Sequence, residues 1–219
     1  MIDVHRVVED QARLTSYRAT QNNEKAIQLE ILIDLTKPAL KETEWHDLIS
    51  TPFRYILPVL PHYSARFRLP YFYKNVFYAA SCLQTATYEY SYHFMRQRLH
   101  LQQRRKRIRN ETGTRTGFSV EVNDSSVLRL HDYPNLQKLL HRSDYSASHI
   151  FIKEHPDSNF IVYPSVRDPE HRDNMAILEM KLLGKTIKVE RQLSYFYDYK
   201  KKLITWIDLK LAVLWEQVC

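Results

Sequence analysis

Residues 76–105 read VFYAASCLQTATYEYSYHFMRQRLHLQQRR, which predicts a strand directly before a long helix. The apolar opening VFYAA is typical of a short buried strand. Ser81 and Gln84 have the spacing of a capping box, so we expect the helix to begin near Leu83. Glu89 then lies about two turns into this helix, on the element that follows the strand.

The rest of the chain adds elements of both kinds. Asn22 or Asn23 is suited to begin a helix that Pro38 ends, whereas the prolines within residues 51–75 argue against a helix there. We expect further helices over 22–37, 44–50, 145–154 and 207–217, and strands over 118–122, 126–130, 160–163 and from 174 to 206, with a turn near Asp198–Lys201. Strands and helices do not alternate regularly. The predicted fold is therefore α+β, one domain with a mixed or antiparallel sheet and flanking helices.

Composition limits the classes of function. The 219 residues are 44% hydrophobic, enough for one large core, and the net charge of +7 suits an anionic partner. Two cysteines give no disulfide framework, so a reducing, cytoplasmic location is the simpler interpretation. The N-terminus shows no secretory signal, and no apolar run has the length of a membrane helix. The three glycines exclude a glycine-rich phosphate loop, so a phosphate site must use arginine side chains.

Other chemistries have weaker signals. The histidines and cysteines show no metal-ligand spacing, and no serine or cysteine has the sequence context of a nucleophile elbow. The basic run RRKRIR, residues 104–109, is compatible with binding to a nucleic-acid backbone or with a solvated helix end. A nucleic-acid-binding module is therefore an alternative to an enzyme.

The stretch FIVYPSVRDPEHRDN, residues 160–174, places polar residues at a strand end. Pro164 ends the strand, so we expect Ser165 to emerge at the rim of the sheet. Arg167 follows one side-chain alternation later and is expected on the same face.

Five short motifs in this order resemble the RES-domain family, named for its Arg, Glu and Ser positions. The segments are TPFRY, SARF, VFYAA, TATYE, and IVYPSVRDP preceded by DYSASHIF. By this resemblance the site residues are Arg54, Tyr55, Arg66, Tyr78, Glu89, Ser165, Arg167 and Asn174. The resemblance implies one RES-like domain over 1–219, with the motifs between about 45 and 180 and a helical leader over 1–44.

The family resemblance implies a fold similar to ADP-ribosyltransferases and a toxin of a toxin–antitoxin pair that consumes NAD. The nicotinamide–ribose bond is expected to be cleaved with phosphate or with water, and transfer of ADP-ribose to a protein is an alternative. NAD is then the substrate, phosphate a possible co-substrate, and neither a cofactor nor a metal is implied. The implied partner is an antitoxin with a helix-turn-helix domain, through which alone the complex contacts nucleic acid.

The resemblance also implies roles for these residues. Arg54, Arg66, Glu89 and Ser165 are the expected catalytic residues, and Tyr55, Tyr78, Arg167 and Asn174 are expected to bind substrate. The arginines suit phosphate groups, and the carboxylate suits the positive charge that develops on the ribose.

The chain also departs from the family pattern. Ala65, Arg68 and Asn75 stand where family members usually have glycine. Their loop must therefore take a conformation open to other residues. A family member that binds a nucleotide or a partner without catalysis is a further alternative.

Overall fold

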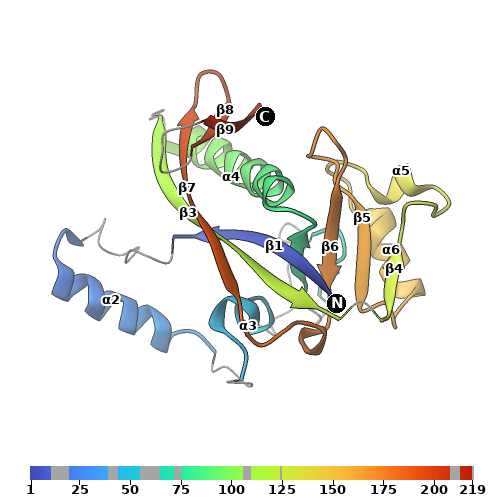
Figure 1. The fold of residues 1–219 in the computed structure, drawn as a ribbon. Helices are drawn as coiled ribbons and strands as arrows, with labels where there is room; N and C mark the ends of the chain where they lie inside the picture. The colour runs from blue at the N-terminus through green and yellow to red at the C-terminus, as the bar shows by residue number, and fades with distance from the viewer. Residues whose placement is uncertain are drawn as a thin grey trace.

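One strongly twisted mixed sheet organises the chain (Figure 1). The structure is a computed structural model, and it describes residues 1–10, 20–38, 44–54, 65–71, 75–105, 110–123, 125–207 and 213–218. Within these residues nine strands are ordered β4-β5-β6-β2-β1-β3-β7-β8-β9. Their bounds are β1 (Ile2–Glu9), β2 (Phe77–Ala80), β3 (Glu111–Val122), β4 (Val127–Arg129), β5 (Phe160–Pro164), β6 (Asp173–Ile177), β7 (Lys188–Asp198), β8 (Leu203–Ile207) and β9 (Val213–Val218). Only β4 and β5 pair in parallel, and the other neighbouring strands are antiparallel.

Helices lie against several parts of this sheet. Their bounds are α2 (Asn23–Leu35), α3 (Asp47–Arg54), α4 (Leu83–Arg105), α5 (Leu136–Leu139), α6 (Ser146–Glu154) and the 3-10 turn η2 (Met180–Leu182). Figure 1 shows α3 and α4 on opposite sides of β1, with α5 and α6 beside the edge that contains β4 and β5. The domain is thus a single α+β unit, as predicted.

Helix α4 packs on the central strands and on β7 and β8. Phe94 and Met95 are buried in one cluster with Tyr195 and Trp206. Close approach at the start of α4 requires a glycine on β3, because a Cβ at Gly117 would lie 2.6 Å from Leu83 Cδ1. The position of α4 brings its second turn, with Glu89, to the neighbourhood of β2 and β6.

Several predicted elements are confirmed. Helix α2 begins after Asn22, whose side chain accepts a hydrogen bond from the backbone N–H of Lys25, and it ends before Pro38. Helix α4 begins at Leu83 and β5 ends at Pro164, both as predicted. The predicted hairpin is formed by β7 and β8, with its turn between them.

Two predictions near prolines and at the C-terminus are wrong. Helix α3 runs through Pro52 to Arg54, because Ile49 and Phe53 pack into the core beneath the sheet and outweigh the hydrogen bond that proline cannot donate. The predicted closing helix over 207–217 is replaced by β9, which pairs with β8 and so satisfies the polar backbone groups of that strand.

Helix α2 accounts for part of the predicted helical leader, but another described part of it is a strand. Residues 2–9 form β1, which lies between β2 and β3 in the middle of the sheet. Eight register pairs join β1 to β3, whereas a single pair, His5 with Ala80, joins it to β2. Pairing with β3 along the whole strand satisfies the backbone hydrogen-bonding groups on that side of β1, which explains why this segment is extended.

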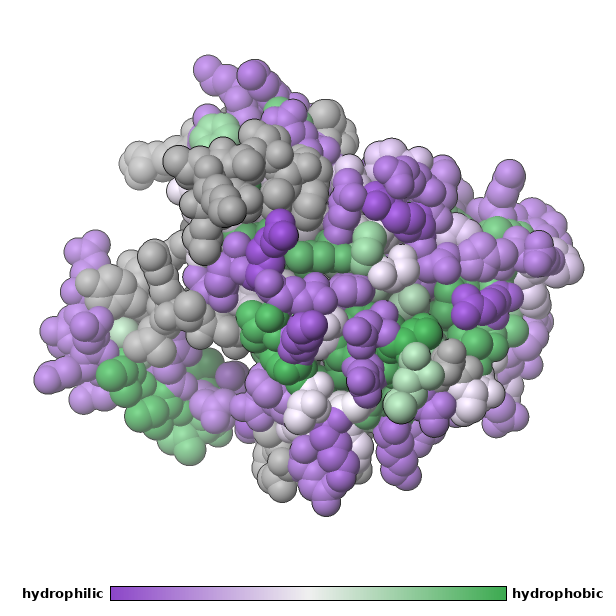
Figure 2. All heavy atoms as spheres, in the orientation of Figure 1, coloured by the Kyte–Doolittle hydropathy of each residue, from purple (hydrophilic) through white to green (hydrophobic). Residues whose placement is uncertain are grey.

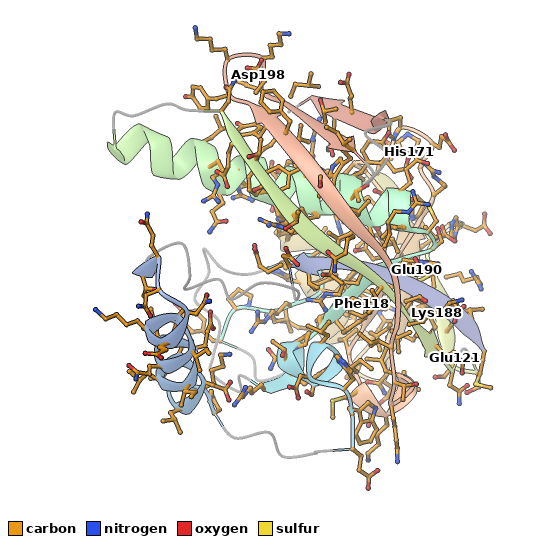
Figure 3. All side chains as sticks on the ribbon, turned by 60° about the vertical axis from the view of Figure 1, so that its left-hand side comes forward. Phe118, Glu121, His171, Lys188, Glu190 and Asp198 are labelled. Carbon is orange, nitrogen blue, oxygen red and sulfur yellow. The ribbon has the colours of Figure 1, made fainter. Side chains whose placement is uncertain are left out.

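Helix α2 stands clear of the sheet in Figures 1 and 3. Its exposed apolar side chains range from 41% exposed at Ile33 to 76% at Leu35, and Ala26 is its buried residue. Figure 2 shows these side chains as an apolar area on α2.

Candidate functional site

Glu89 is held by two hydrogen bonds from separate parts of the chain. Ser165 Oγ donates to Glu89 Oε1 at 2.7 Å, and Asn174 Nδ2 donates to the same oxygen at 2.5 Å. The glutamate comes from α4, the serine follows β5 and the asparagine lies on β6. The fold therefore brings together three of the predicted residues, and Oε2 makes no hydrogen bond with the described residues.

The direction of the Ser165 hydroxyl is determined by its surroundings. Ser165 is fully buried, and its Oγ accepts the backbone N–H groups of Arg167 and Asp168, both at 3.1 Å. With its acceptor capacity engaged in this way, the hydroxyl hydrogen is directed to Glu89. The geometry therefore favours an orienting role for Ser165 over direct donation to a phosphate.

Asp168 anchors the loop that carries Ser165. Its carboxylate accepts Arg172 Nε at 2.7 Å and Thr85 Oγ1 at 2.6 Å, which ties the loop to the first turn of α4. Burial raises the pKa of Asp168, but the hydrogen bonds from Arg172 and Thr85 outweigh it and hold the pKa below its ordinary value. His171, labelled in Figure 3, closes the loop through its Nδ1, 2.9 Å from the carbonyl oxygen of Ser165.

Arg66 lies buried against aromatic rings. Its Nη1 donates to the carbonyl oxygen of Leu139 at 2.6 Å, and its Cζ lies 5.2 Å from the Tyr145 ring centroid and 5.9 Å from that of Tyr163. These contacts fix the guanidinium without a carboxylate partner among the described residues. Its positive charge is thus available to an anionic ligand.

Arg167 is also buried, and its guanidinium is incompletely satisfied. Nη2 donates to the carbonyl oxygen of Arg142, whereas Nε and Nη1 have no hydrogen-bond partner among the described residues. The Cζ lies 3.7 Å from the centroid of the Tyr92 ring. Burial lowers the pKa of Arg167, and the charge of Glu89 opposes this shift. A buried guanidinium N–H group requires an acceptor such as a water molecule or an anion, and that of Arg167 belongs to a residue that lines the pocket described below.

Tyr78 connects β2 to the segment that carries Arg66. Its hydroxyl oxygen accepts the backbone N–H of Phe67 at 3.2 Å, and burial raises its pKa far above the ordinary value. Tyr78 therefore stays a neutral phenol that holds the Arg66 segment against the sheet.

Five of these residues line one pocket, namely Arg66, Tyr78, Glu89, Arg167 and Asn174. Its volume is about 300 Å³, at the lower end of the size range of small-molecule sites. The lining residues are His5, Arg6, Val7, Ala65, Arg66, Tyr78, Ala79, Ala80, Ala86, Glu89, Tyr90, His93, Tyr145, Tyr163, Arg167 and Asn174. Residues of both β1 and β2 line it, which fits the single register pair between these strands.

Arg6 is a site residue that the sequence did not indicate. It lines the pocket from β1, its Cζ lies 4.6 Å from the Phe77 ring centroid, and its buried Nη1 has no partner among the described residues. Burial lowers the pKa of Arg6 to about 10. The sequence IDVHRVVE contains the signal of a strand in its β-branched residues, whereas the family resemblance predicts a helical leader over this segment.

Two expected site residues, Ser165 and Arg54, do not line the pocket, and Ser165 reaches it only through its hydrogen bond to Glu89. Arg54 ends α3, where its Nη1 lies 3.5 Å from Asp34 Oδ1 and its Nε donates to the carbonyl oxygen of Pro38. The structure therefore pairs Arg54 with residues at the end of α2 and not with Glu89. Tyr55 lies outside the described residues.

The positions without the family glycines take ordinary backbone conformations. Ala65 and Arg68 form a turn in which the N–H of Arg68 donates to the carbonyl oxygen of Ala65 at 3.0 Å. None of Ala65, Arg68 and Asn75 has a positive φ. These three positions therefore have backbone conformations that side chains adopt readily.

Metal ligands, membrane helices and the basic run bear on other classes of function. No group of three or more metal-ligating side chains occurs within them. No helix among them is both long and apolar enough to cross a membrane. The basic run begins in the last turn of α4, and its residues 106–109 lie outside the described part of the chain.

The fold and the site define a protein with a carboxylate and several buried arginines around a small-molecule pocket. The chain matches the family model of the RES domain over residues 39–198, which is more than half of its length, and it belongs to the RES-domain family. No curated protein matches it. The family indicates an NAD-related, toxin-like enzyme. The matched range begins after α2, so Arg6 completes the pocket from outside it.

Proposed function

We propose that the chain cleaves the nicotinamide–ribose bond of NAD. The proposal rests on the hydrogen bonds of the Glu89 carboxylate and on the lack of a cationic partner for it among the described residues. Both groups that bond its Oε1 are neutral donors, and no ion pair to Glu89 occurs among the described residues. The carboxylate is therefore oriented while its negative charge is left for a ligand.

A carboxylate of this kind suits a ribose that becomes positively charged. As the bond between C1″ of the ribose and the pyridinium nitrogen breaks, both electrons go to the nitrogen and nicotinamide leaves as a neutral molecule. The ribose passes through an oxocarbenium-like transition state, which a nearby carboxylate stabilises. Glu89 supplies that charge, and Ser165 and Asn174 hold its position.

The arginines suit the phosphates of NAD or an inorganic phosphate. Arg66 has no carboxylate partner among the described residues, and Arg6 and Arg167 have buried N–H groups without acceptors there. Each of these three guanidinium groups can form one part of an anion-binding site, because guanidinium N–H groups donate hydrogen bonds directly to phosphate oxygens. The same pocket is also lined by Tyr78, Tyr145 and Tyr163, whose rings offer flat surfaces for contact with nicotinamide.

The acceptor in this proposal is phosphate or water, which would make the chain an NAD phosphorylase or an NAD glycohydrolase. We further propose that it acts as a toxin whose partner is a helix-turn-helix antitoxin. Family membership supports both statements. Expression of the chain should then deplete cellular NAD and arrest growth, and co-expression of such a partner should relieve the arrest.

The direct test uses purified chain and NAD, with and without phosphate. Free nicotinamide is measured over time, and the second product is identified by its mass. ADP-ribose indicates water as the acceptor, and a phosphorylated ADP-ribose indicates phosphate. Intact NAD under both conditions would contradict the proposal.

A further inference from the structure

His93 lies one helical turn after Glu89 and lines the same pocket. Residues four apart on a helix face the same side, so the imidazole and the carboxylate are neighbours. Among the described residues His93 makes no hydrogen bond, and its ring contacts that of Tyr92 with 5.3 Å between the centroids. Both ring nitrogens are thus available to a ligand or to water.

The surroundings of His93 favour the neutral imidazole. Partial removal from water at the pocket wall lowers its pKa below the ordinary value of 6.5, the negative charge of Glu89 opposes this, and Arg167, Arg96 and Arg66 lower it further. The residue nevertheless keeps an exposed surface, so water and protons reach the ring. A neutral imidazole accepts protons near neutral pH, which is the property of an efficient general base.

The other titratable groups of the pocket are less suited to this role. Burial raises the pKa of Tyr78, Tyr90 and Tyr163, so these phenols hold their protons. His5 also lines the pocket, but its Nδ1 is bonded to Glu190 at 3.0 Å, a residue labelled in Figure 3. In the proposed function the charge of Glu89 is required for the ribose, which leaves the proton transfer to another group.

We propose that His93 is the general base that activates water as the acceptor. This inference rests on the proposed function. The bond from C1″ to nicotinamide breaks and its electron pair goes to the pyridinium nitrogen. The water oxygen forms the new bond to C1″, and the proton of that water goes to a ring nitrogen of His93. The imidazolium then releases the proton to solvent, and ADP-ribose is the product.

The proposal distinguishes the two acceptors. Water must lose a proton as it attacks, whereas the phosphate dianion that predominates above neutral pH attacks without losing one. Removal of His93 should therefore impair the reaction with water and leave the reaction with phosphate largely intact.

The experiment compares the unchanged protein with His93→Gln, and His46→Gln serves as the control because His46 is exposed at the start of α3, outside the pocket. Nicotinamide release and product masses are measured above neutral pH, with and without phosphate, and circular dichroism confirms the fold. We expect His93→Gln to reduce ADP-ribose formation by about 10²-fold or more, the usual range for general-base catalysis, and to change the phosphate product several-fold at most.

The pH profile separates a proton transfer from a structural effect. In the unchanged protein the rate with water should rise with pH as His93 loses its proton, with a midpoint below 6.5. His93→Gln should lack this rise. An unchanged rate with water, an equal loss with both acceptors, or a retained rise in His93→Gln would overturn the role of His93 while the proposed function stands. Absence of nicotinamide release by the unchanged protein would overturn both.

Discussion

Ser165 Oγ lies 2.7 Å from Glu89 Oε1, and the same hydroxyl accepts the backbone N–H groups of Arg167 and Asp168. The serine thus links the turn after β5 to the carboxylate on α4. Because the serine is fully buried, water cannot take over its hydrogen bonds.

Ser165→Ala should therefore affect both stability and turnover. Two buried N–H groups lose their acceptor and Glu89 loses a donor, so we expect a loss of about 1–3 kcal/mol in the free energy of unfolding. Nicotinamide release should fall about tenfold or more, because a misplaced carboxylate stabilises the ribose less well. Urea unfolding and a nicotinamide assay measure the two effects. Ser143→Ala, at an exposed position, is the control, and equal results for the two variants would contradict the orienting role.

Arg6 and Arg54 should differ in NAD binding. Arg6 lines the pocket with a buried, unpartnered N–H group, whereas Arg54 pairs with Asp34. We expect Arg6→Gln to weaken NAD binding about 10- to 100-fold, the value of a lost hydrogen bond to a charged group. Titration calorimetry in a Glu89→Gln background measures binding without turnover. If Arg54→Gln weakens NAD binding and Arg6→Gln does not, the prediction is contradicted and Arg54 belongs to the NAD site.

Asp168 should contribute to stability at neutral pH but not in acid. Its pKa is lowered in the folded state from the ordinary value of 3.8, so the unfolded chain binds the proton more tightly. The contribution is fully present above the unfolded pKa and is lost as pH falls through the lower folded pKa. We expect Asp168→Asn to destabilise the protein at neutral pH, and the difference from the unchanged protein to shrink in acid. Denaturant unfolding across this pH range measures it, and a constant difference would contradict the assignment.

Gly113 on β3 should not tolerate a larger residue. A Cβ there would lie 2.8 Å from ring atoms of Tyr195, which is buried and donates a hydrogen bond to Glu111. We expect Gly113→Ala to cost about 1–3 kcal/mol of the free energy of unfolding through overpacking. Gly184→Ala is the matched control, because its nearest neighbours would lie at 3.5 Å. Equal thermal stability of the two variants would show that the Tyr195 ring moves aside at little cost, and it would contradict the prediction.

Much of the fold follows from local sequence signals. The asparagine cap of α2, the start of α4 at Leu83 and the end of β5 at Pro164 depend on residues within a few positions, and each is confirmed. The predicted helix over 207–217 is wrong because pairing of β9 with β8 is a contact between distant segments. Strand β1 is stabilised by β3, more than a hundred residues later, and no local signal reveals that partner.

The same distinction applies to the site. Short motifs in family order indicated Glu89, Ser165 and Asn174, and the structure brings them into hydrogen-bond contact. Arg6 is distant from those motifs, and only the placement of β1 beside β2 shows that it lines the pocket. Its role and those of the other site residues stay predictions until variants are tested.

The substitution Glu89→Gln isolates the contribution of the carboxylate charge to cleavage of NAD. The substitution keeps the size of the side chain and an oxygen that can accept from Ser165, but it removes the negative charge. With NAD in excess, we expect nicotinamide release by Glu89→Gln to fall on the order of 10²-fold or more below that of the unchanged protein. Glu154→Gln, exposed on α6, should retain full activity, and circular dichroism should show a native fold for both. Release by a folded Glu89→Gln variant at nearly the rate of the unchanged protein would contradict the account.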